Sequence, residues 1–313
     1  MIGKKNILGV GITDATKEEI LEYIVKNLEN FHKKLYFVTP NPEFLVLASK
    51  NPAFKNILNK ADLASADGIG VIIAAKILGK PLKERFAGVD LVKSLCERIA
   101  EKPITVGFLG GRSGVAKKTA ECLLKMHPKL KVTFAGEEWP KNVKARQPRV
   151  SDDAQPGFRG PVKSNPSAHL RQDYGGQASA SAALPLEAFK RSGVGSPSSF
   201  ATPQDASFNN LTIEQFNNRT IDILFVAFGA PKQEFWINEN LNKIPVKIAI
   251  GVGGAFDYLS GKIPRAPGFV RNVGLEWLFR LLVQPWRLKR QLALIEFIWL
   301  VIKEKLSKSH STT

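Results

Sequence analysis

The sequence has few of the residues that build disulfide frameworks or metal sites. It contains two cysteines, Cys96 and Cys122, and both fall within helical patterns, which argues against a disulfide scaffold and against a zinc site. The four histidines lie far apart without ligand spacing, so no histidine-based metal site is predicted. No apolar signal segment precedes Gly9. We therefore expect the chain to work in a reducing cytosol.

A long apolar run is also missing. The best candidate, residues 292–302, is interrupted by Glu296 and has about half of the roughly 20 residues that cross a bilayer. Basic and aromatic residues alternate around it, namely Arg265, Arg271, Trp277, Phe279, Arg280, Trp286, Arg287, Lys289, Arg290, Phe297 and Trp299. Such a segment is typical of a helix that lies on an anionic membrane, and we predict an amphipathic membrane-binding appendage over residues 265–313.

Several nucleotide and hydrolase motifs are absent. The chain has no Asp-x-Asp motif and no carboxylate cluster with the spacing of a magnesium-diphosphate site. It has neither a P-loop nor a nucleophile elbow, which argues against a P-loop NTPase and an α/β-hydrolase. We therefore expect no metal cofactor, and the charge of a leaving group would be met by arginine, lysine and helix amides.

The charge balance is strongly basic. The formal net charge of the 313 residues is +17, which suits nucleic acid, an anionic membrane or a phosphorylated substrate and does not choose among them. The hydrophobic share of 44% allows a large core in one sizeable domain or two small ones.

Strand and helix patterns alternate along most of the chain. Strands are predicted at residues 5–11, 35–39, 61–66, 104–109, 131–134, 221–228 and 246–251. Helices are predicted at 20–31, 42–58 (one or two helices), 69–78 and 91–100. Two more helices follow the glycine-containing segments 110–114 and 229–234, and they end at 126 and at about 241. Thr16 and Glu19 form a predicted capping box before the first helix. The alternation predicts an α/β fold, a Rossmann-like and mostly parallel sheet with helices on both faces, over residues 1–264.

The composition changes between about 140 and 210. Serine, proline, glycine, alanine and glutamine dominate there, and isoleucine is absent. This composition favours a disordered insertion over a packed subdomain, and a foreign origin of the segment is a third possibility.

Three strand-to-helix junctions rich in glycine form the candidate donor site, because ligands of doubly wound sheets bind at the carboxyl ends of the strands. Their candidate residues are Gly110, Gly111, Arg112, Gly229, Pro231, Lys232, Gly253 and Asp257. The first junction lets the backbone approach a diphosphate and adds a guanidinium, although tight packing alone would also explain its glycines. In the second junction Pro231 suits the first position of a helix, so that Lys232 and Gln233 project from the first turn towards a phosphate, unless they merely begin a solvated helix. Glu234 complements the helix dipole there.

Polar residues end two further strands. Thr39 and Asn41 follow one, and Asp67 follows the other as the single carboxylate of a small, apolar stretch. A carboxylate at such a place can act as a general base towards a substrate hydroxyl, or it can cap the helix that begins near Gly68. Arg85 adds a cation nearby in sequence, although arginine is more often a surface residue.

The motifs together resemble the WecG/TagA/CpsF glycosyltransferase family, above all its members of wall teichoic acid synthesis. The resemblance rests on several motifs in the right order, over residues 4–139 and 211–306. They are Thr39-Pro40-Asn41-Pro42, Ala66-Asp67-Gly68, Gly229-Ala230-Pro231-Lys232-Gln233-Glu234, Gly251-Val252-Gly253-Gly254-Ala255-Phe256-Asp257, Arg265-Ala266-Pro267, Gly274-Leu275-Glu276-Trp277 and Gln284-Pro285-Trp286-Arg287.

The resemblance implies a metal-free, inverting transfer of N-acetylmannosamine from a UDP donor to undecaprenyl-diphosphate-linked N-acetylglucosamine. By analogy Asp67 is the base, Thr39 and Asn41 position sugar, and Arg85 and Gln233 belong to the active site. Three arginines of the tail, Arg280, Arg287 and Arg290, match positions used around the lipid diphosphate. Location on the inner face of the cell membrane follows, and family members tend to self-associate.

Two alternatives remain open at this point. A sibling enzyme could move another sugar, such as N-acetylmannosaminuronate or glucose, to a polyprenyl diphosphate. A nonenzymatic membrane or nucleic-acid module would also use the +17 charge, but it leaves the polar strand-end motifs unexplained, so we expect no nucleic-acid partner.

Overall fold

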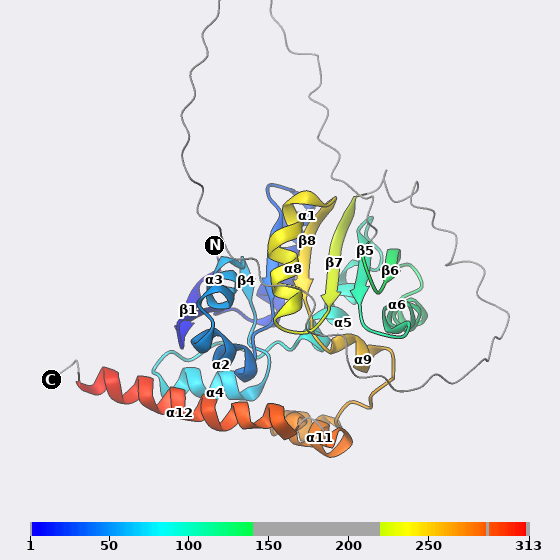
Figure 1. Cartoon of the computed structure of the whole chain (residues 1–313). Coiled ribbons are helices and arrows are strands. Elements are labelled where there is room, and N and C mark those ends of the chain that lie inside the picture. Colours follow the sequence, from blue (N-terminus) through cyan, green and yellow to red (C-terminus); the bar gives the residue numbers. More distant parts are fainter. Residues whose placement is uncertain (1, 140–219, 286–287, 311–313) are drawn as a thin grey trace, which may run out of the picture. The chain divides into compact units, whose positions relative to one another are not determined.

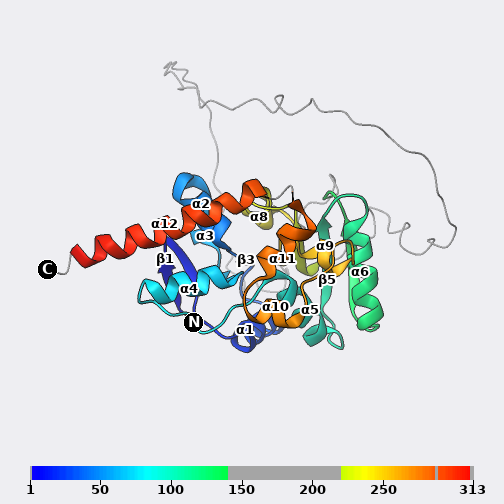
Figure 2. The ribbon, with the colours of Figure 1, turned by 90° about the horizontal axis from the view of Figure 1, so that it is seen from below.

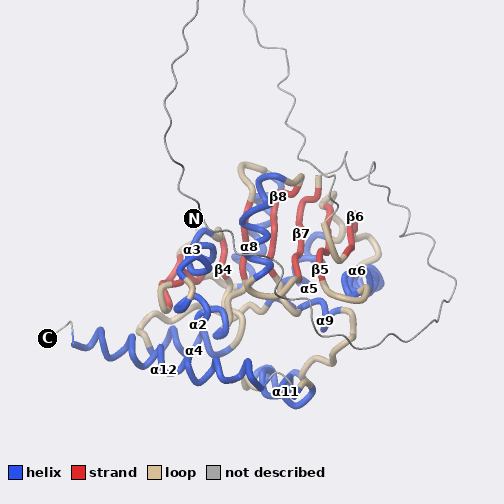
Figure 3. The backbone as a smooth tube through the Cα atoms, in the orientation of Figure 1, coloured by secondary structure: helices blue, strands red, loops and turns tan. Residues whose placement is uncertain are grey.

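A six-stranded parallel sheet forms the centre of the fold (Figures 1 and 3). The computed structural model describes residues 2–139, 220–285 and 288–310, so the predicted insertion lies outside the described residues and stays a prediction. The strands are β3 (Leu35–Val38), β4 (Leu63–Ala64), β5 (Thr105–Gly110), β6 (Lys131–Gly136), β7 (Ile221–Ala227) and β8 (Val246–Gly251). They lie in the order β4-β3-β8-β7-β5-β6, and every neighbouring pair is parallel. The predicted α/β class with a mostly parallel sheet is confirmed.

Helices cover both faces of this sheet, as predicted, because successive strand residues point to opposite sides. On β7, Ile223 and Phe225 join a core with α1 (Lys17–Glu29), α5 (Gly88–Ile99), α6 (Val115–Met126) and α9 (Ala255–Leu259). Leu224 and Val226 of the same strand join a second core on the other face. The second core contains residues of α2 (Pro42–Lys50), α3 (Pro52–Lys60), α4 (Ile69–Ile77), α8 (Lys232–Asn240) and the 3₁₀ turn η1 (Leu241–Lys243).

The helix starts follow local sequence signals. Thr16 and Glu19 form the predicted capping box of α1. The predicted helical stretch at 42–58 divides into α2 and α3, since Asn41 and Asn51 each cap a helix that begins with proline. The structure starts α5 at Gly88, three residues before the predicted start at residue 91.

The single strand predicted over residues 5–11 is wrong. The chain forms instead a hairpin of β1 (Lys4–Ile7) and β2 (Val10–Thr13), which pair antiparallel outside the main sheet. Leu8 and Gly9 between them have φ values of 51° and 82°, which turn the chain back on itself. The apolar run concealed this turn because Leu8 is an unusual residue at positive φ.

After α9 the chain continues with the helices α10 (Gly268–Asn272), α11 (Glu276–Val283) and α12 (Leu288–His310). Helix α12 runs along α2 and α4 (Figure 2), and Phe297 and Val301 of α12 are buried in the second core. An ion pair of 2.6 Å between Lys50 and Glu296 adds to this contact. Among the described helices, none has the length and apolar character that a bilayer crossing requires.

The direction of chain progression reverses between β4 and β5. The chain moves from β3 outwards to β4 and then crosses to β5 on the other side of β8 and β7. Open parallel sheets bind ligands in the crevice that such a reversal leaves at the carboxyl ends of the strands. The loops that follow β3, β4, β5, β7 and β8 therefore meet at one edge, where a shared site is expected.

Candidate active site

A cavity of about 1290 Å³ lies at this edge of the sheet. It is larger than the roughly 300–1,000 Å³ of a usual small-molecule pocket. Most residues predicted for the site line it, namely Thr39, Asn41, Asp67, Arg85, Gly110, Gly111, Arg112, Gly229, Lys232, Gly253, Asp257 and Arg280. Pro231 and Gln233 do not line the cavity. Arg287 and the side chain of Arg290 lie outside the described part of the chain, so their roles stay predictions.

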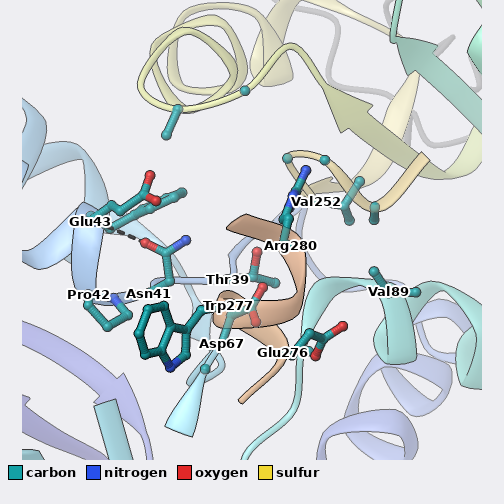
Figure 4. Close-up of a pocket in the computed structure, with 18 of the residues that line it drawn as sticks. Thr39, Asn41, Pro42, Glu43, Asp67, Val89, Val252, Glu276, Trp277 and Arg280 are labelled. Carbon is teal, nitrogen blue, oxygen red and sulfur yellow. Dashed lines mark hydrogen bonds between the residues drawn. The ribbon is translucent and has the colours of Figure 1, made fainter. Parts of the chain in front are cut away.

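Asp67 follows β4 and faces the cavity beside Thr39 and Trp277, below Arg280 (Figure 4). Its Oδ2 accepts a hydrogen bond of 3.3 Å from the backbone N–H of Gly88, at the start of α5. Helix α4 begins after Gly68 without any side-chain cap, so the alternative role of Asp67 as an N-cap is excluded.

Burial raises the pKa of Asp67 to about 6. The Gly88 hydrogen bond and the charge of Arg85 act in the opposite direction, whereas the nearby carboxylate of Glu276 raises the pKa further. A carboxylate with this pKa is mostly ionised at pH 7, and its conjugate acid is close to neutral in strength. Both properties suit a general base.

Thr39 and Asn41 each use one atom to hold the fold. The Thr39 hydroxyl donates to the carbonyl of Gly251 at 3.0 Å, which joins the loop after β3 to the end of β8. Asn41 Oδ1 accepts from the N–H of Phe44 at 3.0 Å and caps α2. The amide nitrogen of Asn41 points away from α2 (Figure 4). Both side chains are therefore held in fixed positions on the cavity wall.

Arg85 belongs to an ionic network that reaches the C-terminal helices. Glu276 at the start of α11 lies 3.8 Å from Arg85 Nη1 and accepts from Arg265 Nε at 3.2 Å. Arg265 also makes a bidentate pair with Asp90 of α5, at 2.7 and 2.8 Å. Although burial opposes the effect, the hydrogen bonds from Arg265 lower the pKa of Asp90. Sequence reasoning gave no role to Asp90 or Glu276, because their partners lie far away along the chain.

Arg280 lies over the loop that follows β8. Its guanidinium is 4.8 Å from the centre of the Tyr258 ring, in a cation–π contact. A Cβ atom at Gly254 would come within 2.8 Å of Arg280 Nη2, so the glycine makes room for the arginine. Helix α11 thus places a cation directly against the glycine loop of the sheet.

Gln233 is fully buried behind the cavity wall, and the projection towards a phosphate predicted for it is wrong. Helix α8 begins at Lys232, and Pro231 is its N-cap. The proline was predicted to be the first helical residue, which is one position further along the helix. Gln233 Oε1 accepts from the N–H groups of Gly229 at 3.2 Å and Gly253 at 3.0 Å. Gln233 therefore joins the loops after β7 and β8, which both line the cavity. Its contribution to activity stays a prediction.

Glu234 is the partner that fixes this arrangement. Its Oε1 accepts from Gln233 Nε2 at 2.6 Å, which orients the amide so that Oε1 faces the two glycine N–H groups. Burial raises the pKa of Glu234 to about 7, and the hydrogen bond from Gln233 opposes this rise. The sequence suggested only a dipole interaction for Glu234, since nothing in the local pattern shows that its side chain points inwards.

The glycine-rich loop after β5 packs tightly. A Cβ atom at Gly110 would lie 2.8 Å from the carbonyl carbon of Ala227, so close packing explains this glycine. The N–H of Gly114 at the start of α6 donates to Glu137 Oε1 at 2.9 Å. The sequence suggested the N–H groups of this helix start for a diphosphate, and one of them is thus already hydrogen-bonded to a carboxylate. Binding of the donor by Gly110, Gly111 and Arg112 stays a prediction.

Within the described residues, no group of three or more histidine, cysteine, aspartate or glutamate side chains could hold a metal ion. The carboxylates of the network described above are instead paired with arginines.

Fold and cavity define an α/β protein with a large, partly charged cavity at the carboxyl edge of a parallel sheet. The model of the glycosyl transferase WecG/TagA/CpsF family matches residues 5–148 and 177–311. The chain therefore belongs to this family. The match leaves out residues 149–176, which fall inside the predicted insertion.

Three relatives have the same name, N-acetylglucosaminyldiphosphoundecaprenol N-acetyl-beta-D-mannosaminyltransferase. The protein from Bacillus spizizenii is 27% identical over 310 residues, which cover 98% of this chain and 95% of the relative. The protein from Bacillus subtilis is 22% identical, with coverages of 97% and 93%. The protein from Staphylococcus aureus strain MRSA252 is 26% identical, with coverages of 96% and 93%.

The buried charge of Asp67 should cost stability. Its pKa in the folded protein is about 6, against 3.8 for the ordinary group, so the cost is absent below pH 4 and complete above pH 6. We expect Asp67→Asn to raise the free energy of unfolding at pH 7 by roughly 1–2 kcal/mol and to change it little at pH 4. Urea unfolding at both pH values measures this difference. A destabilised variant at pH 7 would contradict the assignment.

Loss of Glu234 should act in the opposite direction. Glu234→Leu leaves Gln233 Nε2 buried without its acceptor, which we expect to lower the free energy of unfolding by about 1–3 kcal/mol. Glu234→Gln keeps an oxygen for the same hydrogen bond and should recover most of this loss. Urea unfolding of the two variants at pH 7 makes the comparison. Equal destabilisation by both would show that charge, not amide orientation, is what matters.

Proposed function

We propose that the chain is an inverting hexosyltransferase that moves N-acetylmannosamine from UDP-N-acetylmannosamine to a polyprenyl-diphosphate-linked N-acetylglucosamine. One observation supports this most strongly: Asp67, a carboxylate with a pKa of about 6, shares a cavity with Arg280 and with the glycine loops after β7 and β8. The shared name of the three relatives supports the choice of sugar and acceptor.

In the proposed reaction Asp67 takes the proton of the attacking hydroxyl of the acceptor sugar. The oxygen then bonds to the anomeric carbon of the donor sugar, while the bond from that carbon to the UDP oxygen breaks on the opposite side. The configuration inverts, and the proton stays on Asp67 until the products leave. Thr39 and Asn41 are the proposed positioning groups for sugar, because both lie beside Asp67 on the wall.

The negative charge that develops on UDP needs a fixed cation. Lys232 starts α8 at the end of the loop after β7, Arg112 follows the glycines after β5, and both line the cavity. Preorganised cations in an enclosed site stabilise a leaving diphosphate without reorganisation of solvent. We therefore assign the donor diphosphate to this side of the cavity and propose that no metal is required.

The C-terminal helices are the proposed contact with an anionic membrane on the inner face of the cell membrane. Large apolar side chains on α10, α11 and α12 and the residues between them are exposed: Phe269, Val273, Leu275, Trp277, Leu278, Leu282, Val283, Leu288, Leu292, Ile295, Ile298, Trp299, Ile302 and Leu306. An apolar surface of this extent that also bears arginine and lysine suits a lipid interface. Arg280, Arg287 and Arg290 are proposed to bind the diphosphate of the lipid acceptor.

The central test measures UDP release from UDP-N-acetylmannosamine, with a polyprenyl-diphosphate-N-acetylglucosamine acceptor and EDTA present. We expect acceptor-dependent release that survives EDTA and falls by about 100-fold or more in Asp67→Asn. The control is Glu101→Gln, whose exposed pair with Lys129 lies outside the cavity, and it should retain both the release and the pH profile described next. Release that disappears with EDTA would contradict the metal-free mechanism. Activity of Asp67→Asn equal to that of the unaltered chain would show that Asp67 is not the base.

The pH profile is the second part of this test. Because the base must be ionised, kcat/KM should rise about tenfold per pH unit below pH 6 and level off above it. Absence of this limb from the profile would remove Asp67 from the role of base.

Asp90 should affect turnover without touching substrate. Asp90→Asn removes the charge that anchors Arg265, so α11 and its Arg280 lose a fixed position over the cavity. We expect kcat/KM to fall by about tenfold or more, since breaking one side of a partly buried pair costs roughly 2–3 kcal/mol. Glu101→Gln breaks the exposed pair with Lys129 and should change nothing. Equal, small effects of both variants would show that the anchor is dispensable.

A further inference from the structure

The cavity continues beyond the polar site into an apolar groove between α4 and α12. On α4 the groove is lined by Ile73 and Ile77, and on α12 by Leu294, Ile298 and Ile302. These five residues belong to the same cavity as Asp67 and Arg280. The cavity therefore has one charged end and one end made of aliphatic side chains.

Helical spacing in both segments produces the groove. Ile73 and Ile77 are four residues apart on α4, and Leu294, Ile298 and Ile302 repeat the same spacing on α12, so each set forms one stripe. The two helices are in contact, and Gly70 of α4 also packs closely against α2. A Cβ atom at Gly70 would lie 2.9 Å from Pro42 and 3.7 Å from Phe297.

Below the stripes the groove is closed. Phe297 and Val301 line the cavity and are nearly fully buried against the second core, which gives the groove an apolar floor. The side chains of the walls stay accessible, since Ile73, Ile77, Ile298 and Ile302 are each about half exposed. Four isoleucines that line a cavity and still contact water leave apolar surface to be covered by a ligand.

The chemistry of the two ends identifies that ligand. At the polar end Arg85 and Arg265 form ion pairs with Glu276, and Arg280 lies over the Tyr258 ring, whereas the five wall residues of the groove are all aliphatic. A matching molecule has an anionic head and a hydrocarbon chain attached directly to it. A donor nucleotide has no such chain, and a polyprenyl diphosphate has both parts.

We propose that the groove between α4 and α12 binds the first isoprene units of the polyprenyl acceptor and thereby holds its diphosphate next to Arg280. The inference rests on the proposed function, whose acceptor it describes in more detail. In this arrangement the protein recognises the lipid chain itself. A helix surface that only rests on the membrane makes no such distinction.

Helix α12 offers a matched pair of residues for the test. Ile298 is 58% exposed and lines the cavity, whereas Ile295 is 68% exposed and does not. Both are isoleucines of the same helix, so an asparagine at either position costs similar helix propensity and similar exposed apolar surface. A membrane contact would use both, and the groove uses only Ile298.

The first measurement is binding of farnesyl diphosphate and of inorganic diphosphate to the full chain in detergent-free buffer, by calorimetry. We expect farnesyl diphosphate to bind at least about tenfold more tightly, because burial of its chain adds apolar contact. Ile298→Asn should remove most of this advantage and leave inorganic diphosphate binding unchanged, while Ile295→Asn should keep it. Equal affinities for both ligands, or an equal loss of farnesyl diphosphate affinity in both variants, would contradict the proposal that the groove binds the isoprene chain.

Turnover then separates this inference from the proposed function. With acceptors of identical head group, Ile298→Asn should lower kcat/KM about tenfold for a long polyprenyl chain and not for a single isoprene unit, with donor KM unchanged. Sedimentation with phosphatidylglycerol vesicles should be weakened alike by both variants. If the unaltered chain releases no UDP with either acceptor, the proposed function fails, and the farnesyl diphosphate result still decides the groove.

Discussion

The bidentate contact of Arg265 with Asp90, extended by Glu276, is the interaction on which the candidate site depends. It joins the segment before α10 and the start of α11 to α5, a helix of the sheet's first core. Without this contact the sheet edge would present glycine loops and Asp67 to open water. With it, α11 encloses the carboxylate and brings Arg280 to the β8 loop. Ion pairs contribute most when they are partly buried and share several hydrogen bonds, and this one meets both conditions.

The sequence predicted the elements well where the signal was local. The periodicity of the apolar residues predicted the parallel sheet, and the capping box predicted the start of α1. The division of α2 from α3 was left open, and the structure places it at Asn51. The sequence prediction failed at Leu8, because an apolar residue at positive φ interrupts a run that otherwise reads as one strand. It failed at Gln233 because the direction of a side chain in a first helical turn depends on what packs above it, here the loops of two different strands.

The candidate site was predictable in its position and less so in its electrostatics. Polar residues at strand ends sufficed to place Asp67 and Thr39 in one region, whereas Arg280 was predicted from the family resemblance, and all three line the cavity. The pKa of Asp67 could not be read from its neighbours in sequence. It depends on enclosure by α11 and on the charges of Glu276 and Arg85, which approach Asp67 only in the folded chain.

The end of β8 supports both sides of the cavity. The carbonyl of its last residue, Gly251, accepts a hydrogen bond from the Thr39 hydroxyl. Two residues later, the N–H of Gly253 donates a hydrogen bond to Gln233 Oε1. A backbone segment with partners on either side transmits a shift from one to the other. If a nucleotide displaces this loop on arrival, the displacement reaches Thr39, where the sugar of the other substrate is expected. Synergy between donor and acceptor would then arise from one short stretch of main chain, without a hinge or a moving domain.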